Sequence, residues 1–176
     1  LDKLNCKSLV FGYDNHFGKN REGSPKYIDT EFKNSINSFI VNEKLIDGDV
    51  VSSSRVKFLL QEGNVKLANE YLGYRYTINS TIVHGNALGR TIGFPTANLK
   101  IKEDYKLIPK EGVYIISSKI KDKTFFGMMN IGFKPTIPGE NYSLEVYFFN
   151  LNQDLYNETI TILFLVLISF TSAKRK

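Results

Sequence analysis

The stretch VYIISSKIKDKTFFGMMNI, residues 113–131, decides the fold class of this chain. Two runs rich in β-branched and aromatic residues flank a polar triplet, and that arrangement predicts an antiparallel hairpin. Outward from the hairpin, apolar and polar residues alternate at 76–82, 144–149 and 160–164. Such alternation predicts further strands. Five or six strands without an intervening helix predict a mainly β fold over residues 76–176, a small closed antiparallel barrel.

Residues 1–75 have a different pattern, in which short apolar runs are mixed with helical spacing. The apolar run at 8–11 enters a turn-rich segment, which predicts a strand followed by a loop. Residues 30–39 are a candidate helix. Between 52 and 73, serine N-caps, apolar residues at helical spacing and closing glycines predict a helical hairpin. We therefore treat residues 1–75 and 76–176 as two modules.

Composition narrows the class of protein. With 42% hydrophobic and 23% charged residues in a chain of 176, it is neither disordered nor fibrous. A single cysteine cannot form an internal disulfide. One cysteine and two histidines also supply too few ligands for an ordinary zinc site. The apolar residues 160–170 are too few to span a membrane, and residues 1–7 show no signal-peptide pattern. We expect a cytoplasmic protein without a membrane partner, and the oligomeric state stays open.

The charge balance leaves two interpretations open. Lys and Arg number 23 against 18 Asp and Glu, a net charge of +5. Such an excess suits partners that carry phosphate, and it also suits a solvated surface. Tyrosines and phenylalanines on a small barrel would offer stacking surfaces to nucleic acid. The basic residues are scattered along the sequence, however, so we expect no nucleic-acid partner and keep a nucleic-acid-binding barrel as the alternative.

The segment HGNALGRTIGFPTAN, residues 84–98, carries the strongest chemical signal. It lacks the Gly-Lys-Ser/Thr of a P-loop, and its glycines are not spaced as in a dinucleotide-binding fingerprint. Glycines around Arg90 still suit a backbone loop that approaches phosphates. Thr96 and Asn98 share one face of an extended segment, and their oxygens suit Mg²⁺. The alternative is a glycine-rich barrel turn in which both side chains bond to the local backbone.

The ten residues GRTIGFPTAN, 89–98, closely resemble the signature of the riboflavin kinases. Further segments match that family in its order: GVY at 112–114, NIG at 130–132 before PT at 135–136, SLEV at 143–146 and DLY at 154–156. Segments within residues 11–23, 51–57 and 68–76 resemble the rear part of the FMN adenylyltransferase (FAD synthetase) module of bifunctional bacterial enzymes. The resemblance implies a Greek-key β-barrel preceded by an incomplete α/β nucleotidyltransferase fragment.

The resemblance also implies the activity, which is phosphorylation of riboflavin to FMN by ATP, and we expect the parent protein also to convert FMN to FAD. Glu145 matches the catalytic carboxylate, which takes the proton of the ribityl terminal hydroxyl as that hydroxyl attacks the γ-phosphate. Thr96 and Asn98 would hold Mg²⁺ and the ATP phosphates. The other implied binding residues are Gly85, Gly89 and Arg90 in a covering loop, and Ser53, Ser54 and Lys57 in a second phosphate-binding segment.

The sequence departs from the family in several places. Residues 1–75 contain no HxGH-type motif, and Lys57 gives a point charge where the family has an arginine fork, so we expect no FAD synthesis by this chain. Asn157 replaces a glycine, and asparagine tolerates the positive φ of such a turn. After Phe164, the apolar residues 165–170 replace a charged segment and a helix that covers the flavin. We therefore expect weak or absent kinase turnover, and an inactive flavin or nucleotide binder is a further alternative.

Overall fold

The structure is a computed structural model that describes residues 5–83, 96–133 and 142–169. Internal contacts divide the chain into two compact units, Leu1–Val51 and Ser52–Lys176. This division falls before residue 75 because the helices that follow Val51 pack with the barrel. The assignment of residues 1–75 to a separate functional module stays a prediction.

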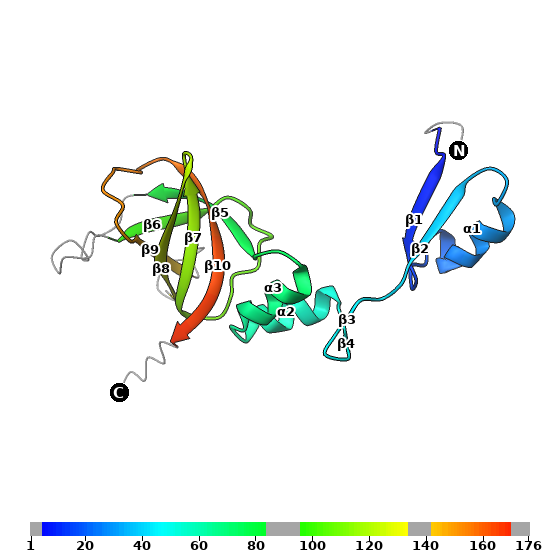
Figure 1. The fold of residues 1–176 in the computed structure, drawn as a ribbon, viewed down its shortest axis with the longest axis horizontal. Coiled ribbons are helices and arrows are strands. Elements are labelled where there is room, and N and C mark those ends of the chain that lie inside the picture. The colour runs from blue at the N-terminus through cyan, green and yellow to red at the C-terminus, as the bar shows by residue number, and fades with distance from the viewer. Residues whose placement is uncertain (1–4, 84–95, 134–141, 170–176) are drawn as a thin grey trace. The chain divides into compact units, whose positions relative to one another are not determined.

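The first unit contains a parallel pair of strands with a helix between them in the sequence. Strand β1 (Ser8–Gly12) pairs in parallel with β2 (Asn37–Val41), and α1 (Pro25–Glu31) connects them. Figure 1 draws these elements. The short elements of the unit are η1 (Lys19–Arg21), β3 (Leu45–Ile46) and β4 (Asp49–Val50). The strand predicted from the apolar run at 8–11 is confirmed.

The helix predicted at residues 30–39 is wrong. Helix α1 begins earlier because the Ser24 side chain caps it, accepting a hydrogen bond from the backbone N–H of Tyr27 at 3.1 Å. Pro25 presets the backbone of the first turn, and the helix ends at Glu31. Residues 37–41 form β2 instead, since their aromatic and β-branched side chains favour an extended backbone that β1 can pair with.

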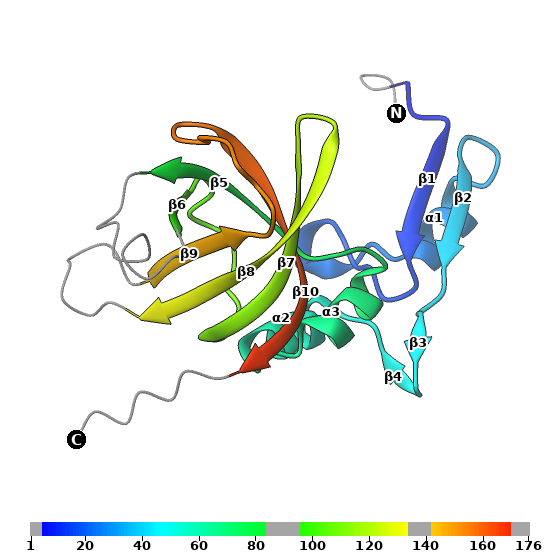
Figure 2. The ribbon, with the colours of Figure 1, turned by 60° about the vertical axis from the view of Figure 1, so that its left-hand side comes forward.

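The second unit is built on a closed barrel with the strand order β10-β5-β6-β9-β8-β7, and all its strand pairs are antiparallel. The strands are β5 (Thr77–Val83), β6 (Ala97–Ile101), β7 (Gly112–Ile120), β8 (Lys123–Phe133), β9 (Tyr142–Phe148) and β10 (Thr159–Ser169). Strand β10 returns to lie beside β7, the first of three consecutive strands, which is the Greek-key order. The predicted barrel and its β7–β8 hairpin are confirmed (Figure 2).

Inward-facing side chains fill the barrel, because they alternate with outward-facing ones along each strand. The rings of Tyr114 and Phe164 pack edge to face with centroids 5.4 Å apart, and neither residue is exposed. Other buried members of this core are Ile78, Ile82, Ile116, Met129, Ile131, Val146 and Ile162. Since the interior is packed with apolar groups, polar chemistry is left to the outer face and the ends of the barrel.

The predicted helical hairpin is confirmed, and it packs on the barrel. Helices α2 (Ser53–Gln61) and α3 (Val65–Leu72) each begin after a side chain that accepts a backbone N–H bond. The Asn69 amide of α3 donates to the carbonyl of Phe164 at 2.9 Å and accepts from the N–H of Tyr76 at 2.7 Å. Figures 1 and 2 show both helices beside β10. Among the described residues, no helix has the length and apolar character needed to cross a bilayer.

Gly127 in β8 lies under the backbone of β9. A Cβ atom at this position would lie 2.3 Å from the carbonyl oxygen of Tyr147 and 3.0 Å from the Cα of Phe148. Because backbone cannot move aside without disturbing the strand pairing, we expect Gly127→Ala to lower the free energy of unfolding by about 1–3 kcal/mol. Urea unfolding measures the change. The matched control is Gly132→Ala in the same strand, where a Cβ would meet nothing closer than 3.8 Å; an equal loss in both variants contradicts this account.

Two buried tyrosines make the stability of the barrel unit sensitive to alkaline pH. Burial raises the pKa of Tyr76 and of Tyr114 from 10.0 to about 12, and their hydroxyls donate to the carbonyls of Leu107 and Lys110. In the unfolded chain both lose their protons near pH 10. The folded state therefore binds more protons between pH 10 and 12, and its stability falls across that window.

We expect the urea midpoint to be level just below pH 10 and to fall as the pH rises toward 12. The double variant Tyr76→Phe, Tyr114→Phe starts from a lower stability, because it lacks both hydrogen bonds, but its midpoint falls less steeply. Identical slopes for wild type and double variant over that window contradict the assignment of the pH dependence to these two phenols.

Candidate active site

Three adjacent strands of the barrel carry polar side chains in one row. The register pairs Asn98 of β6 with Glu145 of β9, and Glu145 with Asn130 of β8. Directly paired residues of an antiparallel ladder project to the same face of the sheet. Leu144 and Val146 on either side of Glu145 are buried core residues, with exposed fractions of 4% and 1%. The row therefore faces outward, and it presents one acid between two amides.

Two hydroxyl groups hold the carboxylate of Glu145. Thr96 Oγ1 donates to Oε2 at 3.4 Å, and Ser143 Oγ donates to Oε1 at 3.2 Å. Thr96 directly precedes β6, and Ala97 pairs with an inward-facing residue of β9. Thr96 and Asn98 on either side of Ala97 therefore project outward together, as their spacing predicts. The structure thus brings Thr96, Asn98 and Glu145 into one cluster, while their chemical roles remain predictions.

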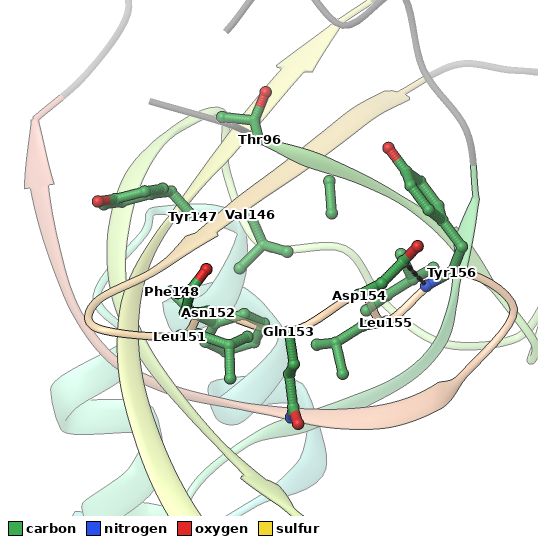
Figure 3. A pocket seen from close by; sticks show the side chains of 12 residues that line it. Thr96, Val146, Tyr147, Phe148, Leu151, Asn152, Gln153, Asp154, Leu155 and Tyr156 are labelled. Atoms are coloured by element: carbon green, nitrogen blue, oxygen red, sulfur yellow. Dashed lines mark hydrogen bonds between the residues drawn. The ribbon is translucent and has the colours of Figure 1, made fainter. Parts of the chain in front are cut away.

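A pocket of about 430 Å³ adjoins this cluster. Thr96 lies on one side of it, and the connection between β9 and β10 lies on the other (Figure 3). The barrel contributes Ile82, Thr96, Ala97 and residues 146–148, and the connection contributes residues 151–156. Apolar strand residues and polar loop residues therefore share a cavity, and Thr96, which donates a hydrogen bond to Glu145, forms part of its wall.

The connection that lines the pocket is held in place by backbone hydrogen bonds. The N–H of Asn157 donates to the carbonyl of Ile82 at 2.9 Å, and the N–H of Ile82 donates to the carbonyl of Glu158 at 3.0 Å. Within the connection, the N–H of Tyr156 donates to Asp154 Oδ1 at 2.9 Å. Asn157 has a φ of 65°. Asn157 therefore has the positive φ that an asparagine was expected to tolerate here.

Three of the remaining predicted site residues lie on a helix and not in this cluster. Ser53, Ser54 and Lys57 are exposed residues of α2. Helix α2 packs on α3, and α3 packs on β10. Among the described residues, no hydrogen bond joins Ser53, Ser54 or Lys57 to Glu145. Three further predicted residues, Gly85, Gly89 and Arg90, lie outside the described residues.

Sequence reasoning missed Ser143 and Asn130 as members of the cluster, although both lie in segments that resemble the riboflavin kinases. For Ser143 a signal existed, because a residue two positions before Glu145 in a strand shares its face. Asn130 becomes a neighbour of Glu145 only through the register of β8 and β9, which no local pattern shows.

The family model for riboflavin kinase, Flavokinase, matches residues 72–170, more than half of the chain. The chain therefore belongs to the riboflavin kinase family. The matched residues include all the strands of the closed barrel and the row formed by Asn98, Glu145 and Asn130.

Curated relatives are bifunctional riboflavin kinase/FMN adenylyltransferases. The protein of Listeria monocytogenes is 38% identical over 163 residues, which are 90% of this chain and 50% of that protein. The Bacillus subtilis protein is 38% identical over 163 residues, with 90% and 51% covered. A crystal structure of a macrolide-efflux protein from Streptococcus pneumoniae aligns with a TM-score of 0.88 and 32% identity, over 99% of this chain and 56% of that one. The chain spans about half the length of these relatives.

Proposed function

We propose that this chain transfers the γ-phosphoryl group of ATP to the 5′-hydroxyl group of riboflavin and so forms FMN. The observation that carries the proposal is the outward-facing carboxylate of Glu145, held by two hydroxyls beside Asn98, in a member of the riboflavin kinase family. The family match also accounts for the Gly/Arg-rich segment before β6. A nucleic-acid-binding barrel is therefore not favoured.

Glu145 acts as the proton acceptor in this proposal. The 5′-oxygen forms a bond to the γ-phosphorus, the bond from that phosphorus to the bridging oxygen breaks, ADP leaves, and the hydroxyl proton passes to Glu145. An ionised carboxylate offers about four lone-pair positions. The hydroxyls of Thr96 and Ser143 occupy one on each oxygen. The carboxylate is thus oriented and still has lone pairs free for the substrate.

The oxygen atoms of the cluster fit a magnesium ion. In phosphate-transferring enzymes Mg²⁺ is bound by one or two carboxylates, the substrate phosphates and water. Among the described residues, no group of three or more His, Cys, Asp and Glu is placed to hold a metal ion. The available metal ligands at this site are therefore one carboxylate and the neutral oxygens of its neighbours. We expect Thr96 and Asn98 to hold the ion beside Glu145. When bound, the ion would neutralise negative charge on the phosphates of ATP.

The pocket beside Thr96 suits the nucleoside part of ATP. If the phosphates lie at Thr96 and Asn98, the base reaches the adjoining cavity of about 430 Å³, a volume within the range of small-molecule sites. The partly exposed Leu151 and Tyr156 offer surface to a planar ring, and the exposed Gln153 offers polar groups to its edge. Riboflavin then approaches Glu145 from the side away from the pocket.

The first unit supports the proposal that residues 1–75 belong to an α/β nucleotidyltransferase module. Parallel sheets are normally covered on both faces. Four apolar side chains of β1 and β2 are nevertheless at least half exposed: Val10, Phe39, Ile40 and Val41. We propose that this sheet is part of the FMN adenylyltransferase module that the names of the relatives include. Ser53, Ser54 and Lys57 then serve the phosphates of that module.

FAD formation requires more than these residues, because residues 1–75 contain no HxGH-type motif. The partners proposed for the chain itself are riboflavin, FMN and ATP, and its proposed location is the cytoplasm.

Removing the charge of Glu145 tests the kinase function. With riboflavin and Mg·ATP, we expect Glu145→Gln to lower the rate of FMN formation by about 10²–10⁴-fold, since the proton acceptor is lost. The melting temperature should change little, because Glu145 is outside the core. The matched control is Glu70→Gln on the exposed surface of α3. The rates follow from chromatographic separation of FMN from riboflavin.

Three outcomes distinguish the alternatives. FMN formation by wild type that is slow, and lost in Glu145→Gln, supports a kinase with the weak turnover expected from residues 165–170. Riboflavin binding without FMN formation in wild type identifies an inactive binder. Equal rates in wild type and Glu145→Gln show that another group accepts the proton.

The metal requirement tests the role of Asn98. We expect Asn98→Ala to raise the Mg²⁺ concentration for half-maximal rate about tenfold, the equivalent of one lost ligand contact of about 1.4 kcal/mol. Lys100→Ala is the control, because Lys100 is exposed two residues further along the same strand. The rate is measured against Mg²⁺ concentration at saturating ATP, and an unchanged midpoint in Asn98→Ala removes this residue from the metal site.

A further inference from the structure

Asp154 is the only acidic residue among the described residues that line the pocket. Its Oδ1 accepts the backbone N–H of Tyr156, two residues further along the chain, at 2.9 Å (Figure 3). An aspartate side chain that bonds in this way takes the place of a backbone group and fixes a turn. The proposed reaction gives this side chain no role, although it belongs to the pocket wall.

The bond from Tyr156 to Asp154 closes a turn around Leu155. Leu155 is buried and lines the pocket, and Tyr156 beside it is partly exposed and lines the pocket too. The turn therefore determines which of these two side chains enters the core and which stays at the pocket surface. Asp154 thus acts on the shape of the pocket through its two neighbours.

The turn continues directly into the barrel. The carbonyl of Leu155 accepts the N–H of Glu158 at 3.0 Å, and strand β10 begins at Thr159. Asn150 and Asn157 bracket the connection with φ values of 56° and 65°, a region that residues other than glycine rarely adopt. Because the backbone has an unfavourable conformation at both ends of the connection, a side-chain bond between them helps to select one arrangement of the wall.

We propose that Asp154 is a positioning residue for the nucleotide, on which it acts through Tyr156 without touching it. This inference rests on the proposed kinase function, in which the side chain of Tyr156 offers surface to the base. The turn requires an oxygen acceptor at the length of an aspartate side chain, and it does not require a negative charge. Without that acceptor the wall samples several arrangements, and the entropy lost in ordering it then opposes the binding of ATP.

Three substitutions of Asp154 separate geometry from charge. Asp154→Asn keeps an oxygen acceptor at the same place without the charge, Asp154→Glu keeps the charge one carbon further out, and Asp154→Ala removes both. We expect Asp154→Ala and Asp154→Glu to raise KM for ATP about 2–10-fold, the equivalent of one hydrogen bond. Asp154→Asn should stay close to wild type. If Asp154→Asn raises KM as much as Asp154→Ala does, the charge carries the effect and the inference is overturned.

Further measurements distinguish positioning from a general loss of structure. In all three variants kcat and KM for riboflavin should stay unchanged, because Asn98 and Glu145 lie on strands β6 and β9 and not on the connection. Amide hydrogen exchange at Tyr156 should be faster in Asp154→Ala and Asp154→Glu but not in Asp154→Asn, since exchange reports local opening. Asp122→Ala in the exposed turn between β7 and β8 is the control. Equal increases in KM for ATP and for riboflavin show a general defect and overturn the inference.

Direct binding separates this inference from the proposed function. The dissociation constant of Mg·ATP is measured by calorimetry without riboflavin, for wild type and the three variants. If wild type forms FMN but Asp154→Ala leaves KM for ATP unchanged, the positioning role is wrong and the kinase function stands. If wild type forms no FMN but wild type and Asp154→Asn bind Mg·ATP more tightly than the other two variants, the kinase function is wrong and the positioning role stands. A wild type that does not bind Mg·ATP overturns both.

Discussion

Closure of the barrel by β10 is the constraint on which the candidate site depends. Residues 159–163 of this strand pair with β5, and residues 163–169 pair with β7, so the sheet has no open edge. In a closed sheet with an apolar interior, register is strongly specified, because a slip by one residue turns every side chain to the other face. Such a slip in β9 would move Glu145 into the core and Val146 out of it.

The barrel separates packing from chemistry. Core residues such as Tyr114 and Phe164 fill the interior, and they hold the strands in the register that aligns the outer row. The outer position of the row avoids burying the carboxylate of Glu145, because this residue is partly exposed and has a hydroxyl partner on each oxygen. A rigid wall with polar groups on one side is well suited to positioning, on which phosphoryl transfer largely depends.

Most of the fold could be predicted because its signals are local. Alternation with a period of two indicates strands, and caps with glycines indicate the helices from 53 to 72. The failure at residues 30–39 has a physical cause, since its apolar residues fit a helix as well as a strand. Pairing with β1 makes residues 37–41 a strand, and the Ser24 cap makes the helix begin earlier in the chain. The assignment of residues 1–75 to a nucleotidyltransferase module came from a resemblance to a family, because neither strand alternation nor helix caps carry that information.

By itself, the sequence determined that Thr96 and Asn98 share a face and that Glu145 projects opposite its apolar neighbours. These relations follow from the two-residue repeat of a strand, which is a property of the nearby chain. The tertiary structure alone decided that Asn98, Glu145 and Asn130 form one row and that Ser143 opposes Gly132. Adjacency between strands depends on register, and register is set by burial and closure of the whole barrel.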